Sequence, residues 1–183
     1  MAGSKKIRVI VSAIAIAGVA ALVVAPRLHG QRPNALSPHE SSTATVDGAR
    51  ITITYGRPSM RGRKIYGSLV PYDHWWMPGA DEATKFQTSE TLQFGDFKLP
   101  AGAYTLYTMP GEKKWTLIIN KRTGQFHTQY PEQDDLARLP MTIEHLPAPV
   151  ERLTIEAVPR QTGGALQIDW ETTRVSAAFT VPR

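Results

Sequence analysis

The chain has 183 residues, of which 42% are hydrophobic and 20% charged, a composition typical of a globular domain and not of a disordered chain or a coiled coil. It contains no cysteine, which excludes disulfides, zinc–thiolate sites, iron–sulfur clusters and a cysteine nucleophile. Four of the 21 basic residues and none of the 16 acidic ones lie within residues 1–30. The rest of the chain is almost neutral and lacks the basic face that binding to nucleic acid requires.

The first 30 residues have the pattern of a targeting segment. Lys5, Lys6 and Arg8 precede an uncharged run over residues 9–25 that is apolar except for Ser12, as in the charged start and apolar core of a signal peptide. The run is also close to the shortest length that spans a membrane. We expect residues 1–30 to be either a signal peptide or an N-terminal membrane anchor that contacts the membrane through residues 7–25. Either alternative places the following domain outside the cytoplasm, in the periplasm, at the cell surface or secreted.

Residues 31–42 are rich in proline, serine and histidine and show no apolar period, which predicts a linker. After it, the dominant period is two. Apolar Ile51, Ile53 and Tyr55 alternate with polar residues, and the same alternation recurs over residues 153–157 and 166–170. Further strands are predicted over residues 86–88, 91–94, 104–109, 115–120, 142–145 and 174–181.

Turn signals separate these predicted strands. Asp47 and Gly48 match a two-residue hairpin turn, since both types tolerate a positive φ. Only residues 132–139 and 65–70 favour short helical turns. Many short strands with regular turns indicate a single all-β domain over residues 43–183, expected as an antiparallel β-sandwich that is jelly-roll-like or Ig-like. Two stretches without the alternation, residues 55–64 and 70–84, are long loops of the kind that carries function.

Most catalytic signatures are absent from the chain. It has no phosphate-binding loop, dinucleotide fingerprint, nucleophile elbow or zinc-protease motif. Its five histidines, at positions 29, 39, 74, 127 and 145, never stand at metal-ligand spacing. We therefore expect neither a cofactor nor a bound metal, and the absence of a catalytic motif favours a protein that is not an enzyme.

The first long loop concentrates positive charge in Arg57, Arg61, Arg63 and Lys64. Arginine offers a planar fork to phosphate, sulfate or carboxylate, so the loop is a candidate cradle for an anion or a polysaccharide. The alternative, which we favour, is that one or two arginines hold the loop in place through Asp81, Glu82 or carbonyl oxygens.

The second long loop contains adjacent tryptophans, Trp75 and Trp76. In an extended segment they point to opposite faces, so one is expected in the core. The other is expected to cover a sheet edge or to form a stacking platform for a sugar ring, to which Tyr72 adds. Trp115 and Trp170 lie on strand patterns and are expected in the core.

The same loop holds Asp73, His74, Asp81 and Glu82. A carboxylate pair can serve glycoside hydrolysis only at a defined separation, which neighbours in sequence do not provide. We favour a structural role for Glu82, which would accept hydrogen bonds from Arg57, Arg63 or loop amides.

A series of motifs follows in order along the chain, and Trp76 stands among them: YGRP at 55–58, GRKIYG at 62–67, LVPY at 69–72, GA at 79–80, EAT at 82–84, LPAGAY at 99–104, WTLIIN at 115–120 and PVERL at 149–153. Over roughly residues 36–181 the chain thereby resembles the bacterial family catalogued as domain of unknown function 2911. The resemblance implies an exported protein and names no reaction. Met77 stands where the family usually has arginine, and Asp81 where it usually has asparagine. If that pair forms an anion or amide site in the family, the site is altered here.

These observations favour an exported, non-enzymatic binding module whose partner is a carbohydrate, an envelope polymer or a protein. One alternative is a structural or assembly subunit whose edge strands pair between chains. The other is a hydrolase in which Glu82, Asp81 or His74 moves protons, a task that a buried Glu82 would suit. The candidate ligand-binding residues are Arg57, Arg61, Arg63, Tyr72, His74, Trp76, Asp81 and Glu82.

Overall fold

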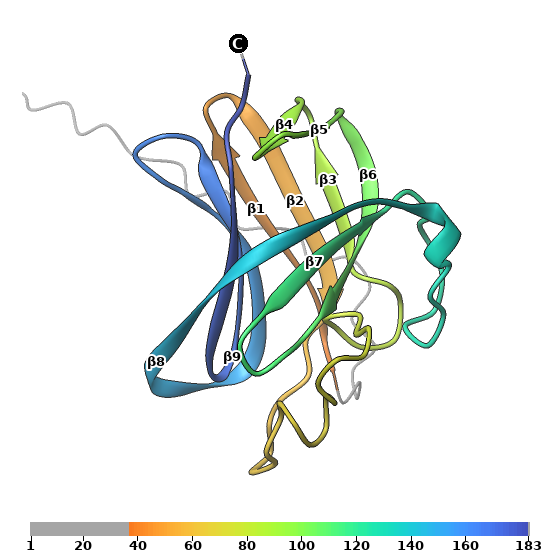
Figure 1. Cartoon of the computed structure of the whole chain (residues 1–183), viewed down its shortest axis with the longest axis vertical. Helices are drawn as coiled ribbons and strands as arrows, with labels where there is room; N and C mark the ends of the chain where they lie inside the picture. Colours follow the sequence, from red (N-terminus) through yellow and green to blue (C-terminus); the bar gives the residue numbers. More distant parts are fainter. Residues whose placement is uncertain (1–36, 183) are drawn as a thin grey trace, which may run out of the picture.

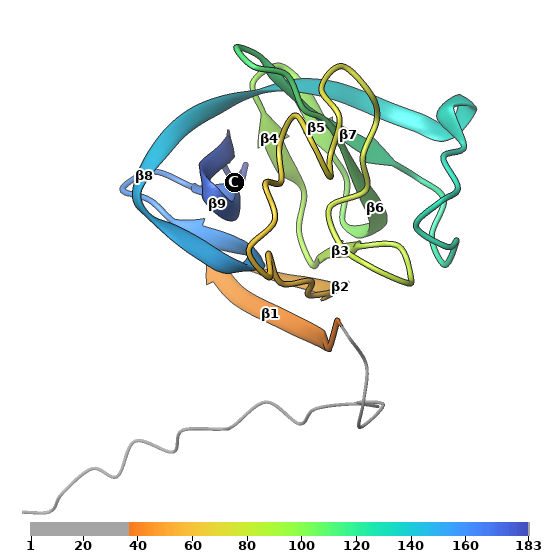
Figure 2. The same ribbon diagram turned by 90° about the horizontal axis from the view of Figure 1, so that it is seen from below.

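The computed structural model describes residues 37–182, and the predicted leader, with its apolar residues 7–25, lies outside them. The described residues form nine strands and one short 3-10 helix, which confirms the all-β prediction. Seven strands make one antiparallel sheet in the order β1-β2-β3-β6-β7-β8-β9, and β4 and β5 form a separate two-stranded sheet. The large sheet curls until it almost closes (Figure 2). The expected two-sheet sandwich is not confirmed.

The elements follow one another along the chain with short connections, apart from the long segment between β2 and β3 and residues 121–131 between β7 and η1 (Figure 1). They are β1 (His39–Val46), β2 (Ala49–Gly56), β3 (Lys85–Thr88), β4 (Leu92–Phe94), β5 (Phe97–Leu99), β6 (Gly102–Met109), β7 (Trp115–Asn120), η1 (Glu132–Asp134), β8 (Asp135–Pro159) and β9 (Gly164–Phe179). Within residues 37–182, no helix is long and apolar enough to cross a membrane.

Strand β1 begins at His39, four residues before the predicted domain boundary at residue 43, so the end of the predicted linker belongs to the sheet. Its pattern escaped detection because short hydroxyl side chains replace apolar ones. The Ser41 hydroxyl lies 2.8 Å from that of Thr54 on β2, and such cross-strand hydroxyl pairs stabilise a sheet. The predicted hairpin turn is present: Val46 pairs with Ala49, and the two turn residues between them have φ values of 47° and 90°.

The two helical predictions are mostly wrong. Over residues 132–139 only the single turn of η1 forms, and from Asp135 onward the chain is strand β8, because this segment pairs with the edge of β7. Residues 65–70 form a compact turn in which the Val70 amide donates to the Ile65 carbonyl at 2.9 Å. In both places tertiary pairing outweighs a weak local helix preference.

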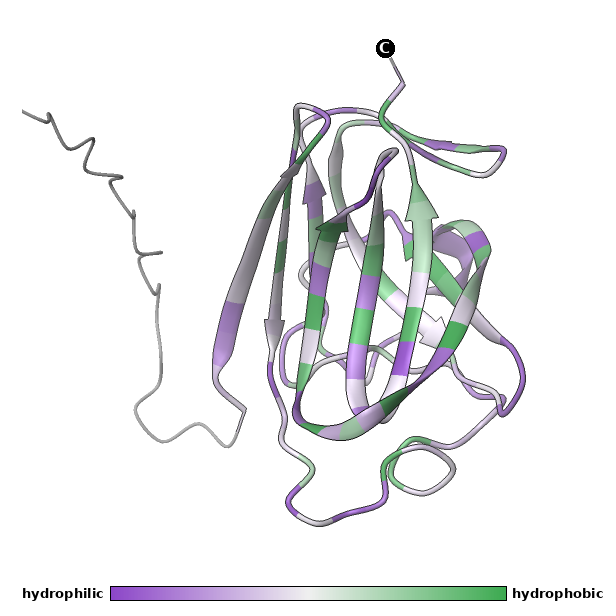
Figure 3. Cartoon of the chain, turned by 90° about the vertical axis from the view of Figure 1, so that its left-hand side faces the viewer, coloured by the Kyte–Doolittle hydropathy of each residue, from purple (hydrophilic) through white to green (hydrophobic). Residues whose placement is uncertain are grey.

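The core fills the inside of the curled sheet. Apolar and polar residues alternate along the strands (Figure 3), and the inward set is almost fully buried, including Ile51, Ile53, Leu106, Leu117 and Ile155. Trp115 and Trp170 are buried as predicted. The alternating pattern therefore places one continuous apolar core between the strands.

The hairpin of β8 and β9 closes the sheet. Two register shifts interrupt its pairing, between His145 and Val150 and between Val150 and Thr154, and β9 bends at Glu171, where φ is +55°. Bulges of this kind bend and twist a strand pair, and the hairpin turns back on itself (Figure 1). Its second half then meets the chain just after β2, where the Leu153 amide donates to the Pro58 carbonyl at 2.9 Å.

Candidate functional site

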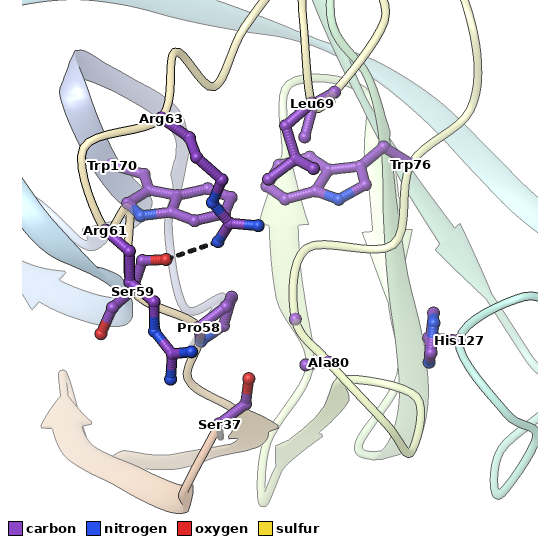
Figure 4. Close-up of a pocket in the computed structure, with 12 residues that line it drawn as sticks. Ser37, Pro58, Ser59, Arg61, Arg63, Leu69, Trp76, Ala80, His127 and Trp170 are labelled. Atoms are coloured by element: carbon purple, nitrogen blue, oxygen red, sulfur yellow. Dashed lines mark hydrogen bonds between the residues drawn. The ribbon is translucent and has the colours of Figure 1, made fainter.

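A cleft of about 380 Å³ lies where the two predicted long loops meet. Its walls come from the first loop through Arg61 and Arg63, and from the second through Trp76 and Ala80 (Figure 4). Arg61, Arg63 and Trp76 are the three predicted candidates that line it. A second hollow lies over the outer face of β1, β2, β3 and β6 and is lined mainly by short polar side chains. We concentrate on the cleft because it combines aromatic and charged groups.

Two indole rings belong to the cleft wall. The rings of Trp76 and Trp170 are nearly parallel, at 13°, with centroids 6.0 Å apart. Tyr66 packs edge-on against both and against Trp115, at a centroid distance of 4.9 Å. Trp76 is half-buried and packs on the core, whereas Trp170 is fully buried. The aromatic wall is thus an extension of the core, and its rings are held in fixed positions.

The first loop is held against β8 by its backbone. Arg61 and Gly62 both have positive φ values, 51° and 72°, so the chain turns sharply there. The amide of Met60 donates to the Glu151 carbonyl at 2.8 Å, and the amide of Arg61 donates to the Glu151 carboxylate at 2.9 Å. These bonds present the side chains of the loop to the cleft from a fixed backbone.

The Arg63 guanidinium is held by its own loop. Its Nε donates to the Met60 carbonyl at 2.9 Å, and its Nη2 donates to the Ser59 carbonyl at 2.8 Å. Within residues 37–182, no protein acceptor bonds its Nη1. The guanidinium points from its loop toward the two indoles (Figure 4), so an ordered cation stands at the edge of the aromatic wall.

Arg57, another candidate, does not line the cleft. Its guanidinium donates to the Leu153 carbonyl at 2.9 Å, to the Thr154 hydroxyl at 2.8 Å and to the Glu40 carboxylate at 2.8 Å. It therefore joins β1 to β8. Arg57 and Arg63 both bond carbonyl oxygens, as the structural interpretation of the basic loop proposed. No bond joins either of them to Asp81 or Glu82 within the described residues.

The second loop is pinned to strand β6. Trp76 and Thr108 exchange backbone hydrogen bonds of 2.7 Å in both directions. Gly56 of β2 lies against Ala80, where a Cβ at position 56 would come within 2.2 Å of the Ala80 oxygen. Met77 is buried and accepts a hydrogen bond from the Thr84 amide at its sulfur. These contacts make the loop an ordered wall of the cleft.

The adjacent tryptophans separate as predicted, one toward the core and one away from it. Trp76 packs on the core, whereas Trp75 is 38% exposed and lies outside the cleft. The Trp75 ring leans on Tyr130, with centroids 5.1 Å apart. Tyr72, a further candidate, packs beside Gly67 and against the core, and His74 is exposed away from the cleft lining.

The carboxylates lie beside histidines. Glu82 is 66% exposed and its Oε2 lies 2.8 Å from Nε2 of His39, while Asp81 lies 3.7 Å from the same nitrogen. The Asp81 carbonyl lies 2.9 Å from Nδ1 of His127, a residue that lines the cleft. Asp81 has a φ of +66°, a conformation that asparagine also tolerates well. Among residues 37–182, no cluster of three histidines and carboxylates could hold a metal ion.

Sequence reasoning missed three contributors to this region. His39 was assigned to a linker, and it now positions Glu82. His127 and Leu69 also line the cleft; His127 stands in none of the quoted motifs, and Leu69 begins the LVPY motif without being a candidate site residue. The sequence did contain a signal for Leu69. A large apolar residue in a loop is available to contact a ligand if it stays exposed, and Leu69 is 46% exposed.

The cleft is positively charged. Within residues 37–182, its lining includes the guanidinium groups of Arg61 and Arg63 and no aspartate or glutamate. Behind the wall, burial raises the pKa of the Tyr66 hydroxyl far above its ordinary value, and that hydroxyl has no hydrogen-bond partner within the described structure. The arrangement offers an aromatic surface and arginine side chains to a ligand.

The model of the family described as "Protein of unknown function (DUF2911)" matches residues 37–179. No curated protein matches the chain, and no solved structure matches it.

Proposed function

Since the chain belongs to the DUF2911 family, whose description names no activity, we propose from the geometry that it is a non-enzymatic binding module and that the cleft between its two long loops binds a saccharide. The observation that carries this proposal is the half-buried indole of Trp76 in the lining of a 380 Å³ cleft, held in place by the near-parallel ring of the buried Trp170. Small-molecule sites are concave, mostly apolar, and about 300–1,000 Å³ in volume.

The chemistry of the lining suits a sugar ring. The C–H face of a pyranose is apolar and packs on an indole, while its hydroxyls need hydrogen-bond partners at the rim. Leu69 and Val70 extend the apolar wall, and Ser37 and Ser59 place polar groups at the rim. This mixture of one aromatic wall and a few polar atoms fixes the orientation of a ligand.

Binding is better supported than hydrolysis. A hydrolase needs an acid and a base that face the substrate, and the cleft lining contains no carboxylate within the described residues. Glu82, which the hydrolase hypothesis needed as a buried group, is 66% exposed and paired with His39. The apolar leader of residues 9–25 supports a location outside the cytoplasm, where envelope and extracellular saccharides are found.

Oligosaccharide binding by the full chain tests the proposal, with tryptophan fluorescence and thermal unfolding as readouts. A saccharide at one hundred times its dissociation constant should stabilise the fold by about 2.7 kcal/mol, or roughly 8 °C. Leu69→Ala removes part of the cleft wall and should weaken binding about tenfold. Leu136→Ala is the matched control, because Leu136 is similarly exposed, at 40%, and lies outside the cleft. Equal affinity in the two variants would contradict this location for the site.

A further inference from the structure

We propose that the saccharide bound in this cleft is acidic and that Arg63 binds its carboxylate. The proposal rests on the binding function proposed above and names the ligand class of the same cleft. It stands on two independent observations, the way in which Arg63 is held and the charge of the cleft lining.

Arg63 is arranged as a preformed anion donor. Its Nε and Nη2 are occupied by the carbonyls of Met60 and Ser59, which fixes the plane of the guanidinium. Nη1, with two N–H groups, has no protein acceptor within residues 37–182. A long flexible side chain normally loses rotamer freedom on binding, and a prior restraint of this kind reduces that cost. The two carbonyls therefore order the cation before a ligand arrives.

The surrounding charge favours an anion. Arg61 and Arg63 line the cleft, and among residues 37–182 no carboxylate lines it. Glu151 of β8, beside the first loop, accepts a hydrogen bond from the amide of Arg61. Complementary charge at a partly enclosed site selects ligands of the opposite sign, so arginine side chains on the cleft wall favour an anionic ligand over a neutral one.

The position of the charge relative to the aromatic wall points to a sugar acid. A hexuronate carries its carboxylate on C5, at the edge of the pyranose ring. A ring that packs on Trp76 would therefore project its carboxylate sideways, and Arg63 lines the same cleft, with its guanidinium on the side of the indoles (Figure 4). A free phosphate has no apolar face and would make no use of the indoles. The planar guanidinium also matches the planar carboxylate in geometry.

Matched tetrasaccharides test the assignment. Isothermal titration of the full chain would compare β-1,4-linked mannuronate with mannose tetramers, and the corresponding galacturonate–galactose and glucuronate–glucose pairs. For at least one pair, the acidic member should bind about ten- to a hundredfold more tightly than the neutral one, as expected for a hydrogen bond to a charged group. That preference should shrink as the salt concentration rises, because salt screens the attraction.

Arg63→Gln separates the role of the charge from that of the wall. The variant should lose the preference for the acidic member, so that its affinities for the two members of a pair become equal. Arg63→Lys should recover only part of the preference, because an ammonium group cannot bond both carbonyls and the ligand in one plane. Lys64→Gln is the matched control, since it removes a neighbouring exposed charge that does not line the cleft, and it should leave the preference unchanged.

The outcomes distinguish the two proposals. If neutral and acidic members bind equally to wild type, or if Arg63→Gln keeps the preference, the proposal of an acidic ligand is refuted and that of a saccharide site remains. If none of the six tetrasaccharides binds, the saccharide-binding function is overturned together with it.

Discussion

Replacement of Tyr66 by phenylalanine is expected to stabilise the protein. The ring of Tyr66 is 4% exposed, and its hydroxyl has no hydrogen-bond partner in the described structure. A buried hydroxyl without a partner costs about 1–3 kcal/mol in proteins. Part of this gain is offset by the packing that the oxygen atom provides. We therefore expect a net increase of about 1 kcal/mol in the free energy of unfolding, or roughly 3 °C in Tm.

Tyr55 provides a matched control of opposite sign. It is equally buried, at 3%, but its hydroxyl accepts a hydrogen bond of 2.9 Å from the amide of Ile155. Tyr55→Phe would leave that buried amide without an acceptor, at a cost of about 1–3 kcal/mol. The assay is urea unfolding of both variants, monitored by circular dichroism. The slope m of each variant is compared with that of wild type to check two-state behaviour. If Tyr66→Phe is as destabilising as Tyr55→Phe, the hydrogen-bond reasoning for both sites is refuted.

Three other predictions concern two contacts that hold the segments around the cleft in place, and the ionisation of the Tyr66 hydroxyl. Gly56→Ala should destabilise the protein by about 1–3 kcal/mol, because the new methyl group overlaps the Ala80 carbonyl; an unchanged urea midpoint would contradict this close contact. Arg57→Lys should cost about 1–3 kcal/mol in unfolding experiments, since an ammonium group cannot keep all three bonds of Arg57 to β1 and β8, whereas Arg63→Lys on the exposed loop should cost less than about 1 kcal/mol. Burial raises the pKa of Tyr66 above its unfolded value of about 10, so its contribution to stability is complete below that pH and declines as the pH rises further. Tm measured from pH 8 to 12 should fall above pH ~10 and should fall less in Tyr66→Phe; a decline in Tm that is identical in both proteins would count against a raised pKa of Tyr66.

The strand pattern was readable from sequence because side-chain alternation is a local property. Ile51, Ile53 and Tyr55 face inward wherever their strand lies, and the turn at Asp47 and Gly48 follows from backbone preference alone. Strand β1 gave no such signal, since hydroxyl residues fill half of it. The closure of the sheet is not a local property either, because Arg57 and Leu153 are 96 residues apart and no period in the sequence specifies which edges meet.

The candidate site was predictable in its location but not in its assignments. The two stretches without alternation do form the cleft walls. The role of each arginine depends on the groups that face it in the folded chain. Arg57 bonds β8 and has a structural role, whereas Arg63 lines the cleft. The pairing of His39 with Glu82 depends on the position of a strand that sequence reasoning had not found.

The hairpin of β8 and β9 also determines at which stage of folding the core can be completed. The core includes Leu153, Ile155, Ile168 and Trp170, all of which follow residue 150, while the strands they cover are complete by Asn120. To bring such distant segments together, the chain loses conformational entropy before the contacts between them stabilise the fold. Until the hairpin arrives, the apolar face of the earlier strands has no cover. Folding should therefore be slow and cooperative, and chains that stop before β8 should aggregate instead of forming a smaller domain.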